Sequence, residues 1–292
     1  MYSIFHIEGG LGKHVAATAV AQCIKNNHPN RKLIVVCAYP EMYVNLDFVD
    51  RVYRHGNTPY FYDDYIRDKD SIIFRHEPYY TTDHIHKRLS LIENWCKLYN
   101  LEYNDERPTL VFNLRQQQIA FNKWRRSKPI MVIQTNGGPM ENQEFPYSWT
   151  RDLPYSTAQG LVNYYKEKYH IIQICRHEYN ALEGVEVVNQ AMSNSELFSL
   201  LLYSEKNILI DSSLQHAAAA LNKPSTVLWI GTSPTVFGYD LHTNIVADIK
   251  ENHKLPDSYI FDYSFNGVTH ECPFVDEDIF KLADIINATD DE

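Results

Sequence analysis

The chain has 292 residues, of which 44% are hydrophobic, and this length suits one large domain or two domains of ordinary size. It carries 27 Lys and Arg against 37 Asp and Glu, and the resulting net charge of −10 argues against broad, unspecific binding of nucleic acid. The five cysteines are scattered and form no Cys-x-x-Cys pair, so neither a zinc knuckle nor a disulfide framework is indicated. No apolar run approaches the ~20 residues of a membrane span.

The first 128 residues predict an α/β domain in which strands alternate with helices. An apolar strand over Tyr2–Ile7 ends at a turn that starts with Glu8, and an Ala/Val-rich helix runs from Lys13 to about Asn26. The turn contains Gly9-Gly-Leu-Gly12, and such glycines let a ligand approach the backbone. Its spacing fits neither the P-loop nor the dinucleotide fingerprint. Further strands are predicted at 33–37, 49–53 and 71–74, and an amphipathic helix at 84–99.

Residues 113–128 form the most basic segment of the chain and contain no acidic residue. The segment predicts a helix that ends before Pro129 and links two domains. Its cations are Arg115, Lys123, Arg125, Arg126 and Lys128. Two interpretations stay open: a solvated helix at a domain junction, or a grip on an anionic acceptor through Arg115, Arg125 and Arg126.

A second α/β domain is predicted for residues 129–275, followed by a closing helix and tail at 276–292. It starts with a buried strand at 130–133, which opens into a long polar loop that contains Asn136, Trp149 and Arg151. A capping box over Ser193–Glu196 predicts the start of a helix at 197–204. Other elements are predicted as a helix at 155–168 and strands at 171–175 and 185–188.

The most informative stretch is Asp211-Ser-Ser-Leu-Gln-His216, which lies between apolar strands at 208–210 and 225–230. Strand, polar turn, Ala-rich helix and strand form a βαβ unit and therefore indicate a parallel sheet. Asp211 and the two serines can cap the helix, whose positive end then faces the crevice where α/β sheets bind phosphorylated ligands. A structural helix with a buried histidine would show the same pattern. A second turn, Gly231-Thr-Ser-Pro234, follows the next strand.

Two α/β halves with these turns resemble the GT-B glycosyltransferases, and more narrowly the family 9-like ADP-heptose:lipopolysaccharide heptosyltransferases. The likeness is sharp at Gly9-Gly-Leu-Gly12 and at Asp211–Pro224 with Gly231–Pro234. There the family carries Asp-Thr/Ser-Gly-x-x-His-x-x-Ala-Ala-Leu-x-x-Pro and Gly-x-Thr-x-Pro. The resemblance implies two Rossmann-like domains with a cleft between them. It also implies transfer of a hexosyl, heptosyl or pentosyl group from a nucleoside-diphosphate sugar to a hydroxyl of a surface glycan, lipopolysaccharide core or lipid-linked acceptor.

The resemblance also assigns roles to residues. The donor would be bound by Gly10, Gly12, Asn136, Arg151, Glu178, Asp211, Ser212, Ser213, His216, Thr232 and Ser233. The family has an aspartate, proposed as the general base, directly after the glycine turn, where this chain has Lys13. We therefore expect Lys13 to stabilise the diphosphate and either Glu8 or His14 to act as base, with Asp63, Asp64 and Glu77 as alternatives. No Asp-x-Asp motif of the metal-dependent transferases is present, so neither a metal nor another cofactor is expected.

Three other functions stay open. The acceptor could be a hydroxymethylated base in viral DNA, and a steep loss of acceptor binding with salt would favour this reading. The chain could instead be a non-catalytic nucleotide-sugar-binding protein, as the lysine at position 13 suggests, or an epimerase of the sugar nucleotide. We expect a cytoplasmic protein with reduced thiols; peripheral attachment at the inner face of the membrane and the oligomeric state are left open.

Overall fold

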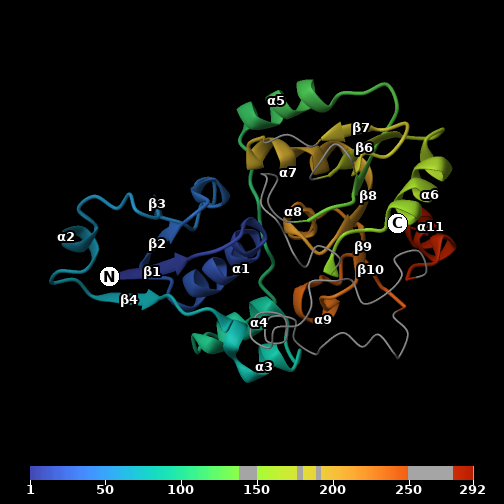
Figure 1. Ribbon diagram of the computed structural model, residues 1–292. Helices are drawn as coiled ribbons and strands as arrows, with labels where there is room; N and C mark the ends of the chain where they lie inside the picture. The colour runs from blue at the N-terminus through green and yellow to red at the C-terminus, as the bar shows by residue number, and fades with distance from the viewer. Residues whose placement is uncertain (138–149, 176–179, 189–191, 249–278, 292) are drawn as a thin grey trace. The chain divides into compact units, whose positions relative to one another are not determined.

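The computed structural model describes residues 1–137, 150–175, 180–188, 192–248 and 279–291 (Figure 1). Contacts divide the chain into two units, Met1–Gln116 (unit 1) and Gln117–Glu292 (unit 2). Each unit contains one β-sheet whose strands are all parallel. The predicted α/β class is therefore confirmed. No helix in the described part of the chain is long and apolar enough to cross a membrane.

Unit 1 is built on a four-stranded sheet in the order β3-β2-β1-β4. Its elements are β1 (Tyr2–Ile7), α1 (Leu11–Asn27), β2 (Lys32–Cys37), the 3-10 helix η1 (Pro40–Met42), β3 (Arg51–Arg54), α2 (Phe61–Tyr65), β4 (Ser71–Phe74), the 3-10 helix η2 (Pro78–Tyr80), α3 (Thr82–Ile85) and α4 (Leu91–Leu98). Helix α1 packs on β1, β2 and α4. The short helix α2 contributes Tyr65 to a separate apolar cluster with Ile4, Ile34 and Tyr53. Because successive strand residues face opposite sides, these two groups cover the two faces of the sheet.

Unit 2 is built on a six-stranded sheet in the order β10-β9-β8-β5-β6-β7. Its elements are β5 (Ile130–Gln134), α6 (Tyr155–Tyr165), β6 (His170–Ile174), β7 (Glu186–Val188), α7 (Asn194–Tyr203), β8 (Ser204–Ile210), α8 (Ser213–Ala220), β9 (Thr226–Trp229), α9 (Pro234–Phe237), β10 (Thr243–Val246) and α11 (Leu282–Asp291). Met131 and Ile133 of β5 pack in one buried cluster with Leu161 of α6 and Ile285 of α11. The capping box of Ser193 and Glu196 is confirmed at the start of α7.

The strand order places a topological switch point in each sheet. In unit 2 the chain winds from β5 through β6 to β7 on one side and continues through β8, β9 and β10 on the other. In unit 1 the chain winds from β1 through β2 to β3, and β4 then lies on the other side of β1. Ligands of open α/β sheets bind outside the carboxyl ends of the strands at such a point. A ligand site is therefore expected at the carboxyl ends of β5 and β8 in unit 2 (the β5/β8 edge) and of β1 and β4 in unit 1 (the β1/β4 edge).

The structure differs from the predicted elements between residues 84 and 99. The helix predicted at 84–99 is wrong, because the chain forms α3 and α4 with a break between them. Lys87 has a positive φ of 52° within the break, and Ser90 caps α4 by accepting a hydrogen bond from the Glu93 amide at 3.2 Å. A positive φ interrupts helical geometry, and a serine cap starts a new helix. Strand β10 was not predicted.

The linker helix α5 (Leu114–Trp124) spans the division between the units. The sequence predicts the domain boundary after this helix, at 128/129, whereas contacts divide the chain at Gln116/Gln117. The Trp124 indole donates to the Ser199 hydroxyl at 3.1 Å, and Lys123 pairs with Glu196 at 3.0 Å. These contacts tie the second half of α5 to α7 of unit 2, and Figure 1 shows the two helices beside each other.

Candidate functional site

The carboxyl end of β8 is linked to the neighbouring strand β5 through Ser212. The Ser212 hydroxyl caps α8 by accepting from the Leu214 amide at 3.1 Å, and it donates to Gln134 Oε1 at 2.7 Å. This bond joins the strands on the two sides of the switch point. The side chain of Ser212 is thus used for structure, and the helix N-terminus itself, which begins at Ser213, carries the partial positive charge at this edge.

Arg151 brings a cation to the same edge. Its Nε lies 3.7 Å from Asp211 Oδ2, and the side chains are 23% and 8% exposed. Asp211 follows β8 directly, so its carboxylate holds the guanidinium near the start of α8. The family resemblance assigns both residues to donor binding, and the structure brings them together. The Asp211 carboxylate faces the Arg151 guanidinium, and like charge would keep this carboxylate from contacting a phosphate.

Asn136 lies at the carboxyl end of β5, and its side chain binds Asp152. Its Nδ2 donates to Asp152 Oδ2 at 3.0 Å, while the Gly137 amide donates to Asp152 Oδ1 at 3.0 Å. Asn180 Nδ2 donates to Asn136 Oδ1 at 3.2 Å. Asp152, which directly follows Arg151, is therefore held against the first residues after β5.

His216 is buried in α8 beside a second histidine, His242. Its Nδ1 lies 2.7 Å from the Tyr239 hydroxyl, and His242 Nε2 lies 3.0 Å from the Gln215 carbonyl oxygen. The Tyr239 ring meets both imidazoles edge-on. Burial lowers the pKa of each histidine to about 4, although the Asp211 carboxylate acts in the opposite direction on His216. Both imidazoles are therefore neutral at pH 7, and His216 can offer a hydrogen bond but no charge.

The hydroxyl of Tyr239 should matter for stability because His216 is buried. In Tyr239→Phe the ring contacts remain, but His216 Nδ1 loses its 2.7 Å partner and keeps only Gln215 Nε2 at 3.2 Å. A hydrogen bond contributes about 0.5–1.5 kcal/mol net, and we expect a loss of this size in the free energy of unfolding. Urea denaturation measures it. Tyr164→Phe is the matched control, since that hydroxyl binds Asp290 at 3.2 Å on the exposed surface; an equal loss in both variants would contradict the prediction.

The turn after β9 carries Thr232 and Ser233. Ser233 caps α9 by accepting from the Thr235 amide at 3.3 Å. The Thr232 hydroxyl is buried and has no hydrogen-bond partner among the described residues. Gly231 packs against Thr150, to whose carbonyl oxygen its amide donates at 2.8 Å. The turn is therefore joined to the segment that carries Arg151. Trp149 and Glu178 lie outside the described residues.

At the edge of unit 1, the glycine turn leads into α1 as predicted. Gly10 is the N-cap of α1, and Gly12 lies in its first turn. His14 is fully buried, with Nδ1 2.9 Å from the Gly10 carbonyl oxygen and Nε2 3.2 Å from the Ala38 amide. Burial lowers the pKa of His14. Because both ring nitrogens contact the backbone, this histidine joins the glycine turn to the end of β2 and lacks access to a substrate.

The remaining charged groups of this edge form two ion pairs. Lys13 Nζ lies 2.6 Å from Glu77 Oε2, and Glu8 lies 3.5 Å from Arg75. The first pair is half-buried and the second is exposed. Asp63 and Asp64 do not belong to this edge, since both lie in the α2 helix.

Among the residues that the structure describes, two of the five cations of the basic segment pair with carboxylates of unit 2. Arg126 forms two hydrogen bonds with Glu186, at 2.6 and 2.9 Å, and Lys123 pairs with Glu196 at 3.0 Å. Arg115 and Arg125 are exposed, and the Arg125 guanidinium lies 5.9 Å from the centre of the Phe121 ring. Because Glu186 already occupies the Arg126 guanidinium, an anionic acceptor would have to displace this carboxylate. This contact weakens the interpretation of the segment as a binding site for an anionic acceptor.

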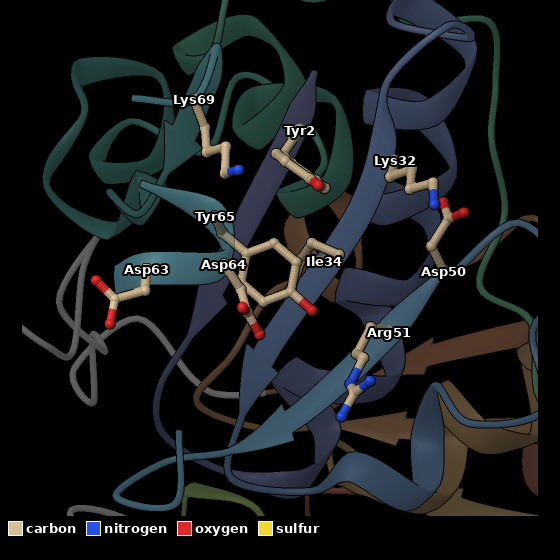
Figure 2. Close-up of a pocket in the computed structure, with 9 residues that line it drawn as sticks. All are labelled: Tyr2, Lys32, Ile34, Asp50, Arg51, Asp63, Asp64, Tyr65 and Lys69. Carbon is tan, nitrogen blue, oxygen red and sulfur yellow. The ribbon is translucent and has the colours of Figure 1, made fainter. Parts of the chain in front are cut away.

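A cavity of about 450 Å³ lies on the α2 face of unit 1, where Figure 2 shows its charged and aromatic lining. Tyr2, Lys32 and Arg51 are at the amino ends of their strands. This is the opposite edge from the one at which parallel sheets bind ligands. The cavity is therefore separate from the candidate site. No group of three or more His, Cys, Asp or Glu side chains in the described ranges is arranged to hold a metal ion.

No family model and no curated protein matches the sequence. Solved structures do match. A glycosyl transferase family 9 protein from Veillonella parvula aligns over 99% of this chain and 96% of its own, with a TM-score of 0.69 and 12% identity. Escherichia coli ADP-heptose lipopolysaccharide heptosyltransferase II aligns over 86% and 91%, with a TM-score of 0.62 and 11% identity. An iron-containing dodecameric glycosyltransferase from enterotoxigenic E. coli aligns over 99% and 75%, with a TM-score of 0.67 and 12% identity. The chain thus has the GT-B fold of these glycosyltransferases.

Several residues of the site were missed by the sequence analysis. Gln134 accepts from Ser212, Tyr239 contacts His216, and His242 contacts the Gln215 carbonyl oxygen. Gln134 ends a predicted strand, so its place at a carboxyl end was a usable signal. Tyr239 and His242 follow the short helix α9, and no pattern in the sequence points to them.

Proposed function

We propose that the chain is a glycosyltransferase that moves a sugar from a nucleoside-diphosphate sugar to an acceptor hydroxyl. The observation that carries this proposal is the β5/β8 edge of unit 2. There the N-terminus of α8, the Arg151 guanidinium and the buried His216 lie at the switch point of a parallel sheet. A helix N-terminus and a cation suit a diphosphate. The solved structures with the same fold are described as glycosyltransferases, which is consistent with this chemistry.

In the proposed reaction, unit 2 binds the donor. Negative charge develops on the diphosphate as the bond to the sugar breaks, and fixed positive groups stabilise this charge more in the transition state than in the substrate. Arg151 and the start of α8 supply these groups. The Thr232 hydroxyl, which is buried and lacks a partner among the described residues, can bind a polar atom of the donor. Neutral His216 can donate one hydrogen bond without repelling Arg151.

A thermal-shift screen against ADP, UDP, GDP, CDP and their sugars tests the proposal. A ligand at 100 times its dissociation constant stabilises the fold by about 2.7 kcal/mol, which corresponds to a shift of several degrees in a unit of this size. In Arg151→Met the affinity for the matching nucleotide should fall about 10- to 100-fold, because a hydrogen bond to a charged group is worth about 1.5–3 kcal/mol. His216→Ala should also weaken binding.

Lys168→Met is the matched control for Arg151→Met, since Lys168 is an exposed cation of the same unit that lies 5.7 Å from the centre of the Tyr164 ring. It should leave nucleotide affinity unchanged. If no nucleotide shifts the melting temperature, or if both variants lose affinity equally, the β5/β8 edge is not a donor site.

We also propose that the transfer needs no metal ion. The support is the cation and the helix N-terminus at the donor edge, which can balance a diphosphate without a divalent ion. Repeating the screen and a turnover assay with a chelator tests this proposal, and loss of activity that added metal restores would contradict it.

A DNA acceptor is not favoured, because two cations of the basic segment, Arg126 and Lys123, pair with carboxylates of unit 2.

A further inference from the structure

Two residues of opposite charge, Lys13 and Glu77, follow the two strands that flank the switch point of unit 1. Strands β1 and β4 are parallel neighbours, with Phe5 opposite Phe74. Lys13 follows β1 in the first turn of α1, and Glu77 lies three residues after β4. Their side chains meet at 2.6 Å, between Nζ and Oε2. This ion pair therefore bridges the switch point at the carboxyl edge, where an α/β sheet holds its ligands.

The position of Lys13 is fixed by its surroundings. Gly9 has a φ of +91°, and a Cβ built there would lie 2.7 Å from Lys13 Nζ and 3.1 Å from its Cε. The lysine side chain thus folds back across a glycine that leaves room for it. Its Nζ also lies 4.7 Å from the centre of the Tyr79 ring. A glycine, an aromatic ring and a carboxylate hold one ammonium group, so the pair is more rigid than an ordinary surface ion pair.

The pair engages one of the two carboxylate oxygens of Glu77. The lysine engages Oε2, and the side chain remains 25% exposed, so Oε1 can receive a hydrogen bond from a substrate hydroxyl. The other candidates at this edge are less suited. Glu8 is 62% exposed and pairs loosely with Arg75 at 3.5 Å, whereas His14 is buried with both ring nitrogens on the backbone. A general base needs a fixed position within reach of the hydroxyl. Of Glu8, His14 and Glu77, Glu77 alone is both held in a fixed position and open to solvent.

We propose that Glu77 is the general base of the transfer and that Lys13 is the residue that positions it. The inference rests on the proposed function. As the acceptor oxygen forms its bond to the anomeric carbon, its proton passes to Glu77. The bond between the anomeric carbon and the diphosphate oxygen breaks, and its electron pair leaves with the nucleoside diphosphate. Lys13 keeps its proton throughout and holds the carboxylate through Oε2.

The test uses the full chain, the nucleoside-diphosphate sugar found in the screen, and water as acceptor, with release of nucleoside diphosphate as the readout. Glu77→Gln should lower kcat at least about 100-fold, the usual contribution of a general base, while the thermal shift with the nucleotide stays the same. Adding formate to Glu77→Ala should restore part of the rate, which a structural role would not do. Lys13→Met should lower kcat and leave KM for the donor unchanged.

Asp83→Asn is the matched control, because Asp83 pairs with Lys97 at 2.7 Å and is 21% exposed, but lies in α3 and not at the strand edge. It should keep full kcat. If Glu77→Gln turns over at the wild-type rate, or if formate restores nothing, Glu77 is not the base. If the wild-type chain neither binds a nucleotide nor releases nucleoside diphosphate, the proposed function fails as well, so the two failures are distinguishable.

Discussion

Lowering the pH from 7 to 5 is expected to destabilise unit 2 by about 3 kcal/mol, because two of its histidines are buried in the neutral form. Burial lowers the pKa of both His216 and His242 to about 4, from the usual histidine pKa of 6.5. Unfolded imidazoles bind protons as the pH falls through 6.5, while the folded ones stay neutral until about pH 4. The stabilisation is therefore complete above pH 6.5 and is lost progressively as the pH falls toward 4.

The window between pH 6.5 and 5 separates this effect from that of the carboxylates. Glu196, for example, has its pKa lowered to about 2 by hydrogen bonds from Ser193 and Lys123, so its contribution disappears only below the unfolded pKa near 4.5. Unit 1 also contains histidines with lowered pKa values, including His14 and His84, whose effect has the same sign. A comparison of variants is needed to isolate unit 2.

Urea unfolding of the wild type and of His242→Gln at pH 7, 6 and 5 makes this comparison. The variant should show a weaker dependence on pH, because one of the two buried imidazoles is gone, and the difference should approach about 1.4 kcal/mol per pH unit near pH 5. Tyr164→Phe is the control, since it removes an exposed hydroxyl and no imidazole and should leave the slope unchanged. Parallel slopes in all three proteins would show that His242 is not buried in its neutral form.

The same burial bears on the proposed function. A neutral His216 does not repel Arg151, so a guanidinium and an imidazole can face one anionic ligand without opposing each other. A bound diphosphate would favour the protonated imidazole, because an opposite charge raises the pKa of a histidine. Nucleotide binding at pH 5 should therefore be accompanied by proton uptake at this group.

The parts of the fold that could be predicted from the sequence are those set by local signals. The apolar run Tyr2–Ile7 and the strand Ser71–Phe74 have the predicted bounds, and the Ser193 capping box begins α7. The Asp211–His216 turn was predicted to lie at a strand end near a helix N-terminus, and it does. Hydrophobic periodicity, glycine turns and capping residues act over a few positions, which is why they are visible in the sequence.

Long-range contacts could not be predicted in the same way. Lys13 and Glu77 are 64 positions apart, and only the strand order β2-β1-β4 places them side by side. Ser212 meets Gln134 across 78 positions for the same kind of reason. The break between α3 and α4 depends on the positive φ of Lys87, a conformation that lysine seldom adopts and that its residue type does not signal.

Replacing Gly231 by alanine is expected to destabilise unit 2 by about 1–3 kcal/mol through overpacking. A Cβ at this position would lie 2.6 Å from the Thr150 Cβ, 3.0 Å from its Cγ2 and 3.1 Å from its Cα. Thr150 is itself buried, and its carbonyl oxygen accepts the Gly231 amide at 2.8 Å, so neither segment can move away without losing that bond. The glycine is required here by close approach of two backbones.

A double-mutant cycle with Thr150→Gly makes this prediction specific. Removing the Thr150 side chain deletes the two nearest clashing atoms and leaves only the contact to its Cα at 3.1 Å. Gly231→Ala should therefore cost less in the Thr150→Gly background than in the wild type, with a coupling of about 1 kcal/mol or more by urea denaturation. Additive losses would mean that the alanine acts elsewhere. Because Arg151 directly follows Thr150, the single variant should also weaken nucleotide binding, and the double variant should recover part of it if this contact sets the position of the guanidinium.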